Sequence, residues 1–178
     1  MSTPSTAAAG PSFYASQHAD SVMPLRAAPP SGATAQALCT RGVVTVDEDS
    51  MVADAARRMR DAQVGALVVV WEPSPGRRIV SGIVTDRDIA TRLVAADRDA
   101  HAFRVGDLMT RDVITARPDD TALDLLAVME RQRVRRMPVV GPQAELIGIV
   151  TAGDLVAALG SQVQALAGAV RSAQRRKV

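Results

Sequence analysis

Short apolar runs and amphipathic stripes alternate along the chain and predict an order of strand, helix, strand, strand, helix. Apolar residues at helical spacing mark the first helix, which Asp49 or Ser50 would cap. The run Ala66–Val70 is short, continuous and β-branched, as is typical of a buried strand. The predicted elements are an extended piece at 43–45, a helix from the cap to about residue 62, a strand at 66–70, a turn at 72–78, a strand at 79–84 and a helix from 86.

The second half of the chain shows the same succession. The predicted elements are an extended piece at 113–115, a helix with an apolar stripe at 122, 125, 126 and 129, a strand at 137–140, a turn at 141–142, a strand at 146–150 and a helix from 153. The last helix continues, because apolar residues recur at three- and four-residue steps, at Leu155, Leu159, Val163, Leu166 and Val170.

An internal repeat explains why the pattern occurs twice. Residues 38–70 align without a gap on residues 108–140, at an offset of seventy positions, and eleven residue types coincide. A second block follows at a shorter offset, where Gly-x-x-Thr-x-x-Asp at 82–88 falls on the same motif at 148–154. Repetition at a fixed offset indicates two copies of one supersecondary unit.

The repeat predicts an α/β (α+β) fold in which two β-α-β-β-α units pack face to face with pseudo-twofold symmetry. Each unit alone has too few strands and helices to cover its own sheet. We therefore expect a first repeat at 35–98, a second at 99–160 and a helical extension with a basic end at 161–178. Residues 1–34 are rich in Ala, Ser, Pro and Thr without a period and are predicted to be a disordered tail.

Composition narrows the class of protein. The chain has 178 residues, of which 47% are hydrophobic and 2% aromatic, so aliphatic residues must fill the core. A formal net charge of +2 gives no reason to expect nucleic-acid binding. Neither a run of about eighteen apolar residues nor a basic-then-apolar leader is present, so we expect a cytoplasmic protein. The single cysteine, Cys39, aligns with Met109 and is a small apolar residue or one half of a disulfide across a dimer.

The most polar part of the repeat lies where a strand meets a helix. Thr85 and Asp88, and likewise Thr151 and Asp154, are three residues apart, so each pair shares one side of a first helical turn. A carboxylate there can accept hydrogen bonds from a ribose diol, and free backbone N–H groups can hold an anion. Gly82 would let the backbone approach a ligand closely. Alternatively, each threonine caps its helix with the aspartate in a capping box, which is compatible with ligand binding.

Two arginines precede a buried strand of the second repeat only. Arg135 and Arg136 would clamp a phosphate, whereas the first repeat has Gly65 and Ala66 at these positions. The alternative is that both arginines extend a solvated helix end. Arg87 is the other cation next to a motif.

Taken together, these motifs resemble a tandem pair of CBS domains over about 37–159. The resemblance implies a regulatory module that binds AMP, ADP, ATP or S-adenosylmethionine between the repeats, with Mg²⁺ only beside ATP. It implies ribose binding by the Thr and Asp pairs, phosphate binding by the two arginines, adenine binding by short extended backbone, and apolar walls. The implied residues are Thr85 with Asp88, Thr151 with Asp154, Arg135 and Arg136, Thr45–Val46 and Thr115–Ala116, and Leu67, Val68, Met137 and Pro138.

We expect one site to dominate, built on Thr85 and Asp88 with Arg135 and Arg136 reaching across, because the first repeat lacks the basic pair. A nucleotide sensor that is not an enzyme and acts through an unknown protein partner is the first hypothesis. A ligand-free, stress-associated interaction scaffold is the alternative. His18 and His101 lie outside the motifs, and no cluster has metal-ligand spacing. Apolar faces on 89–94 and 155–159 predict a homodimer.

Overall fold

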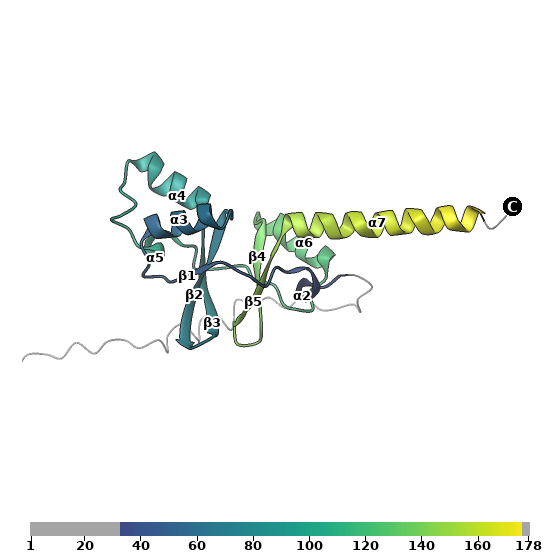
Figure 1. The fold of residues 1–178 in the computed structure, drawn as a ribbon, viewed down its shortest axis with the longest axis horizontal. Helices are drawn as coiled ribbons and strands as arrows, with labels where there is room; N and C mark the ends of the chain where they lie inside the picture. The colour runs from purple at the N-terminus through teal and green to yellow at the C-terminus, as the bar shows by residue number, and fades with distance from the viewer. Residues whose placement is uncertain (1–32, 176–178) are drawn as a thin grey trace, which may run out of the picture.

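The computed structural model describes residues 33–175, which form two lobes side by side with one long helix projecting from the second (Figure 1). The predicted order of elements is confirmed in the first repeat and, apart from its first extended piece, in the second; each repeat also begins with a four-residue helix. In the first repeat the elements are α2 Ala35–Leu38, β1 Thr45–Val46, α3 Val52–Asp61, β2 Ala66–Ser74, β3 Arg77–Thr85, α4 Asp86–Arg92 and the 3₁₀ turn η1 Val94–Ala96. In the second they are α5 Val105–Leu108, α6 Ala122–Gln132, β4 Arg136–Val140, β5 Leu146–Thr151 and α7 Ala152–Arg175.

Each lobe has its own sheet. In the first, β1 runs parallel to β2 and β2 antiparallel to β3; in the second, β4 and β5 form an antiparallel pair. The extended piece predicted at 113–115 forms no strand, and Ala116 alone bridges to Val139. The two sheets meet through buried Val68, Val70, Val80 and Val140. The face-to-face packing of the repeats is therefore observed.

The short segments that open each repeat pack into the opposite lobe. Ala35 is fully buried in the core of the second lobe, and Val105 is fully buried in the core of the first. Thr40 pairs with Ile149, and its counterpart Thr110 pairs with Ile83. Neither lobe therefore has a complete core without a segment from the other repeat.

This exchange also explains how α3 begins. We expected Asp49 or Ser50 to cap it, but the N-cap is Met51 and makes no side-chain cap hydrogen bond. Instead, the backbone N–H groups of Val52 and Ala53 donate to the carbonyls of Phe103 and Ala100. Free N–H groups of a first helical turn need an acceptor, and the chain between the repeats supplies it.

The β2–β3 hairpin is longer than predicted. The segment 72–78 was expected to be a turn, but β2 continues to Ser74 and β3 starts at Arg77. Gly76 takes a positive φ of 82°, and its N–H donates to the Glu72 carboxylate at 2.6 Å. The ladder is irregular between Trp71 and Ser74, which accommodates Pro73.

Helix α7 is the longest element, and its exposed side chains vary along its length. Leu155 is fully buried in the second core, so it needs no partner outside the chain, contrary to expectation. Leu93 is likewise buried in the first core. By contrast Val163 and Leu166, in the middle of α7, are each 67% exposed. The distal part of α7 extends past the lobe (Figure 1). The predicted tail at 1–34 lies outside the described residues except for Ala33 and Thr34, which contact α6 and Thr121.

Candidate functional site

Thr85 and Asp88 form a reciprocal cap at the start of α4. The Thr85 hydroxyl accepts from the Asp88 N–H at 3.2 Å and donates to Asp88 Oδ2 at 2.6 Å. The same carboxylate oxygen accepts the Thr85 N–H at 3.0 Å. Both side chains are half-buried. The capping interpretation of this motif is therefore confirmed, and both hydrogen bonds that the Asp88 carboxylate accepts use Oδ2.

Thr151 and Asp154 repeat this geometry at the start of α7. The hydroxyl and the N–H of Thr151 each donate to Asp154 Oδ2 at 2.8 Å. A third pair outside the repeated motif has a similar arrangement, since the Thr121 hydroxyl donates to Asp124 Oδ2 at 2.7 Å. The cap alone therefore does not distinguish a ligand site from ordinary helix capping.

An arginine that crosses between the repeats distinguishes the first pair. Arg136 Nη1, on β4, donates at 3.3 Å to the carbonyl of Gly65, which also accepts the N–H of Asp86 in the first turn of α4. A β-carbon built on Gly65 would lie 2.8 Å from Asp86 Oδ2 and 3.0 Å from Arg136 Nη2. Glycine at 65 therefore leaves room for a carboxylate and a guanidinium at the N-terminus of α4.

The equivalent position at the start of α7 has a different set of residues. There the carbonyl that accepts the N–H of Ala152 belongs to Arg135, and the residue aligned with Arg136 is Ala66. Alanine cannot cross to the other lobe as arginine does. The two pseudo-symmetric positions thus differ in which repeat supplies the arginine: Arg136 reaches the α4 position from the opposite repeat, whereas Arg135 adjoins the start of α7 from the same repeat.

The other predicted ligand-binding residues fall into two groups. Arg87 and Arg135 are exposed, and Thr115 is half-buried. Four apolar residues are buried in the lobes, and their contact with a ligand stays a prediction: Val46, Leu67, Met137 and Pro138.

The predicted adenine-binding backbone is mostly engaged within the protein. The Thr45 carbonyl accepts from Arg58 Nη1 at 3.1 Å. Ala116 donates its N–H to Pro138 and accepts at its carbonyl from Val140. Gly82, expected to face a ligand, instead faces the other repeat, where a β-carbon would come 2.5 Å from the Met109 sulfur.

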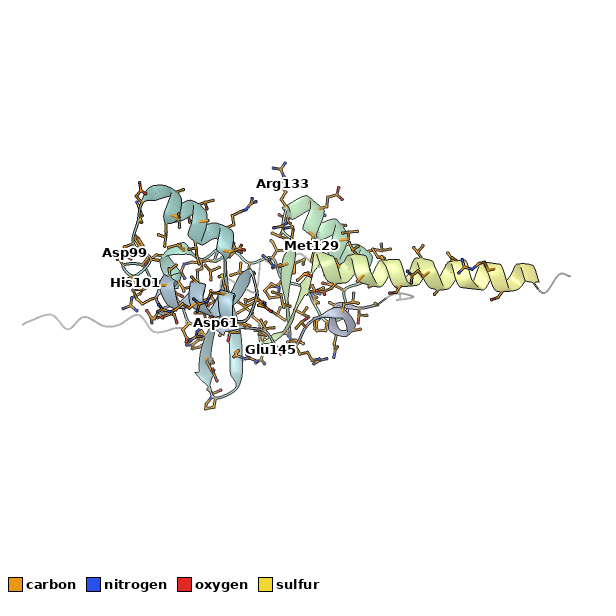
Figure 2. The ribbon with its side chains drawn as sticks, turned by 45° about the horizontal axis from the view of Figure 1, so that its top comes forward. Asp61, Asp99, His101, Met129, Arg133 and Glu145 are labelled. Carbon is orange, nitrogen blue, oxygen red and sulfur yellow. The ribbon has the colours of Figure 1, made fainter. Side chains whose placement is uncertain are left out.

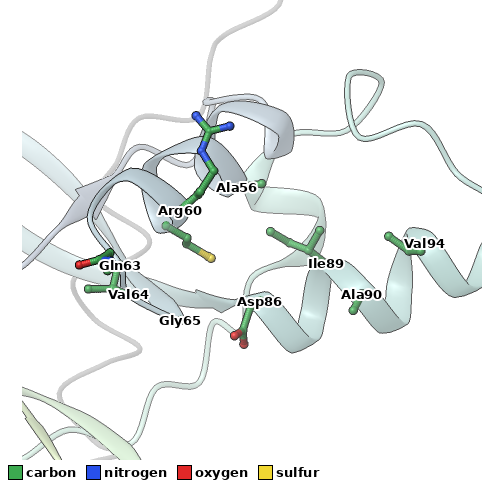
Figure 3. Close-up of a pocket in the computed structure, with 10 residues that line it drawn as sticks. Ala56, Arg60, Gln63, Val64, Gly65, Asp86, Ile89, Ala90 and Val94 are labelled. Carbon is green, nitrogen blue, oxygen red and sulfur yellow. The ribbon is translucent and has the colours of Figure 1, made fainter.

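One feature absent from the sequence-based expectations is a groove of about 500 Å³ between α3 and α4 (Figure 3). Small residues, Ala56 and Ala90, line it, and Arg60 lies on its rim. Gly65 and Asp86, which adjoin Arg136, form one end. The residues of the second repeat that align with Ala56 and Ala90 are the larger Leu126 and Val156. A position-by-position comparison of the two repeats could therefore have predicted a groove on the first repeat only.

His101 and the acidic residues of the described range lie away from the repeated motif or form no metal site. His101 lies close to Asp99 in the connection between the repeats (Figure 2), and its backbone N–H donates to Asp99 Oδ1 at 2.9 Å. Within residues 33–175 there is no group of three or more side chains placed to hold a metal ion. No helix in the same range is long and apolar enough to cross a membrane.

One carboxyl group has a shifted pKa. Burial raises the pKa of Asp120 above its ordinary value, and the neighbouring Asp119 and Asp124 act in the same direction. The Arg117 N–H, which donates to Asp120 Oδ2 at 2.8 Å, opposes the shift. Asp120 precedes α6 and lies outside the repeated motif, so we assign it no part in the site.

The fold and the repeated capped motif define a protein built from two homologous domains in tandem, and sequence comparison identifies the family. The CBS domain family matches residues 35–95 and 105–161, so the chain belongs to the CBS domain proteins and carries two copies in tandem.

Individual relatives agree with this assignment. The chain is 36% identical over 114 residues to the mitochondrial CBS domain-containing protein CBSX3 of Arabidopsis thaliana, across 62% of this chain and 53% of that protein. It therefore spans about half the length of that relative. A putative signal-transduction protein with CBS domains from Burkholderia ambifaria is 35% identical, with a TM-score of 0.59, over 65% of this chain and 81% of that one.

A third comparison concerns the fold alone. The CBS domain pair of protein MJ0100, solved with 5′-methylthioadenosine and S-adenosyl-L-methionine, is 24% identical, with a TM-score of 0.64. The match covers 73% of this chain and 98% of that one. Its ligands are properties of that protein.

Proposed function

We propose that the chain is a regulatory module that binds an adenosine-containing ligand between its two CBS repeats and catalyses no reaction itself. The candidates are AMP, ADP, ATP and S-adenosylmethionine, with Mg²⁺ beside ATP only. The observation that carries this proposal is the hydrogen bond from Arg136 to the Gly65 carbonyl. It places a guanidinium beside the N-terminus of α4, where Thr85 and Asp88 offer a hydroxyl and a carboxylate.

The groups present suit the parts of such a ligand. Asp88 Oδ1 takes part in none of the hydrogen bonds described above and can accept from a ribose hydroxyl. A guanidinium and the N-terminus of a helix both favour an anion such as phosphate. The ligands of the MJ0100 domain pair, which both contain adenosine, support the same class. We therefore favour the α4 position over the α7 position as the main site.

Signalling by such a module requires two states that the ligand distinguishes. The ligand would join groups from both repeats, because Arg136 comes from β4 and Thr85 ends β3. We propose that binding changes how the two lobes are held together and so changes the surface offered to a protein partner. We also propose that the working unit is a homodimer, since Val94 beside the groove is 69% exposed.

A thermal-shift series tests the ligand proposal. The wild type is heated with each of the four ligands, with and without Mg²⁺, because a ligand that binds only the folded state raises apparent stability. We expect one ligand to raise the melting temperature by several degrees, and Asp88→Ala to abolish that shift. Asp124→Ala is the matched control, since it removes the same kind of helix cap away from the motif. A loss with Asp154→Ala and not with Asp88→Ala would place the site at α7.

A ligand-free interaction scaffold is the second candidate. It is favoured by the engagement of Thr85 and Asp88 with each other and by the burial of Leu67 and Met137. The same series separates the two candidates. If none of the ligands shifts the melting temperature at millimolar concentration, the scaffold becomes the better account, and protein partners are the next target.

A further inference from the structure

The part of α7 after its first turn differs in composition from the rest of the chain. Residues 155–170 contain no Asp, Glu, Lys or Arg, whereas these four residue types make up 22% of the whole sequence. Asp154 precedes this uncharged segment and Arg171 follows it. A solvated helix normally carries charged side chains that pair at i and i+4, and here they are missing over about four turns. The composition therefore indicates a helix that is covered in its working state.

Within the described residues, however, this segment lies open. Val163 and Leu166 are each 67% exposed. A β-carbon added at Gly160 or Gly168 would meet nothing within 4 Å. The helix also extends past the second lobe (Figure 1). Two glycines and the lack of ion pairs make such a helix marginal in water, so a partner that covers it would stabilise it.

Beyond buried Leu155, the large apolar residues of α7 are spaced as in a two-stranded coiled coil. Four of them recur at steps of three, four and three residues: Val156, Leu159, Val163 and Leu166. In a heptad, these valines take position a and these leucines take position d. Valine at a with leucine at d favours two parallel strands.

The positions that flank this seam suit pairing with an identical helix. Positions e and g hold only uncharged residues between 160 and 169: Gly160, Gln162, Ala167 and Ala169. Charged residues at e and g normally select the partner of a coiled coil. Uncharged flanks impose no repulsion between two copies, whereas the charged flanks of another helix would find no opposite charge here. The sequence therefore favours a second copy of this chain as the partner.

We infer that two copies of the chain pair their α7 helices, parallel and in register, through Val163 and Leu166 of each copy. This inference rests on the homodimer of the proposed function and adds to it a contact away from the candidate ligand site at α4. The seam is short for a free coiled coil. Once two copies associate through their lobes, however, pairing of the helices is intramolecular and gains from a high effective concentration.

Disulfide formation in the full chain tests the seam. Val163→Cys and Leu166→Cys are made separately in a Cys39→Ser background and oxidised with copper–phenanthroline. Parallel helices in register bring each of these positions against its own copy, so we expect both variants to form a disulfide-linked dimer. Ser161→Cys is the control, because heptad position f lies opposite the seam and the Ser161 hydroxyl donates to the Ala157 carbonyl of its own helix. This control should stay largely unlinked.

The pattern of links decides between the arrangements. An antiparallel pair has a single centre, so only one of the two seam positions could meet its own copy. A link at one seam position alone therefore overturns the inference. Equal linking of all three variants overturns it too, as does the absence of a link at both seam positions.

A second measurement separates this failure from failure of the homodimer. Light scattering after size exclusion reports the state of the wild type, and a monomer at micromolar concentration refutes the homodimer and the seam together. Val163→Glu with Leu166→Glu sets like charges against each other, so we expect this double variant to weaken dimerisation by about tenfold or more. Ser161→Glu with Ala165→Glu adds the same charge to the outer face and should leave dimerisation unchanged. If both double variants remain helical by circular dichroism and dimerise as the wild type does, the homodimer stands and the seam is refuted.

Discussion

Cys39 lies against Gly148, where a β-carbon built on the glycine would come 2.5 Å from the cysteine sulfur. Met109 contacts Gly82 in the same way in the other lobe. The equivalence of Cys39 and Met109 predicted from the repeat is thus seen in the contacts that each one makes. Each side chain fixes the segment that crosses into the opposite lobe. Met109 and Cys39 leave no room for a side chain at positions 82 and 148. Packing between the repeats therefore explains both glycines without a ligand.

We therefore expect Gly148→Ala to destabilise the protein. The added carbon would also lie 2.9 Å from the carbonyl oxygen of Thr40, which is backbone and cannot rotate away. A loss of about 1–3 kcal/mol in the free energy of unfolding is typical of such overpacking. Urea unfolding followed by circular dichroism measures it. At Gly82 the nearest atom belongs to the flexible Met109 side chain, so Gly82→Ala should cost less.

Gly160→Ala is the control for this series. Nothing lies within 4 Å of its added carbon, and the residue lies within α7. Alanine should then stabilise the helix by up to about 1 kcal/mol through its greater helix propensity. Equal effects of Gly148→Ala and Gly160→Ala would show that the contact with Cys39 carries no constraint.

A buried hydroxyl offers a stabilising substitution. Ser81 Oγ is buried, and no hydrogen-bond partner for it lies within residues 33–175. The aligned residue of the second repeat is Ile147, which is apolar. Removing an unsatisfied buried polar group recovers its desolvation cost, so Ser81→Ala should raise the free energy of unfolding by about 1 kcal/mol. A lower midpoint of chemical denaturation in this variant would indicate that the hydroxyl has a partner.

Asp120 gives a test based on pH. Because burial raises the pKa of its carboxyl in the folded state, the folded protein binds more protons there than the unfolded chain. Its contribution to stability is therefore fully present below the unfolded pKa and is lost as pH rises through the raised folded pKa. Asp120→Asn removes this dependence, so the variant should gain stability relative to the wild type from acid toward neutral pH. A fall in the stability of the variant relative to the wild type as pH rises would contradict the direction of the shift.

Arg135 and Arg136, which the sequence could not tell apart, should differ on substitution. Arg136→Ala removes the half-buried hydrogen bond between the repeats, at a cost of about 0.5–1.5 kcal/mol in unfolding free energy without any ligand. Arg135 is exposed, so Arg135→Ala should stay within about 0.5 kcal/mol of the wild type. Arg136→Ala should also reduce the rise in melting temperature caused by the ligand more than Arg135→Ala does. Equal effects of the two substitutions in both measurements would remove the special role of Arg136.

The sequence predicted those features that depend on local spacing. The Thr85 and Asp88 cap is an example, because both residues belong to one helical turn. The exchange of segments was not predictable in this way, since α2 and α5 are four residues long and have no periodicity to detect. The cap of α3 was missed for the same reason, because its acceptors, Phe103 and Ala100, lie far along the chain. The burial of Val46 and Leu67 in the first core also depends on tertiary packing, so the sequence alone did not predict it.

Helix α7 extends away from the second lobe as one continuous helix and can act as a lever. Its first turn follows Thr151, at the end of β5, and its last described turn projects beyond the lobe (Figure 1). Twenty-four residues rise about 36 Å at 1.5 Å per residue. A rotation of about 5° at the base of a lever of this length displaces its tip by roughly 3 Å. A small adjustment between the lobes would thereby become a displacement of several ångströms at the tip, and a smaller one at exposed Val163 and Leu166 near the middle of the helix.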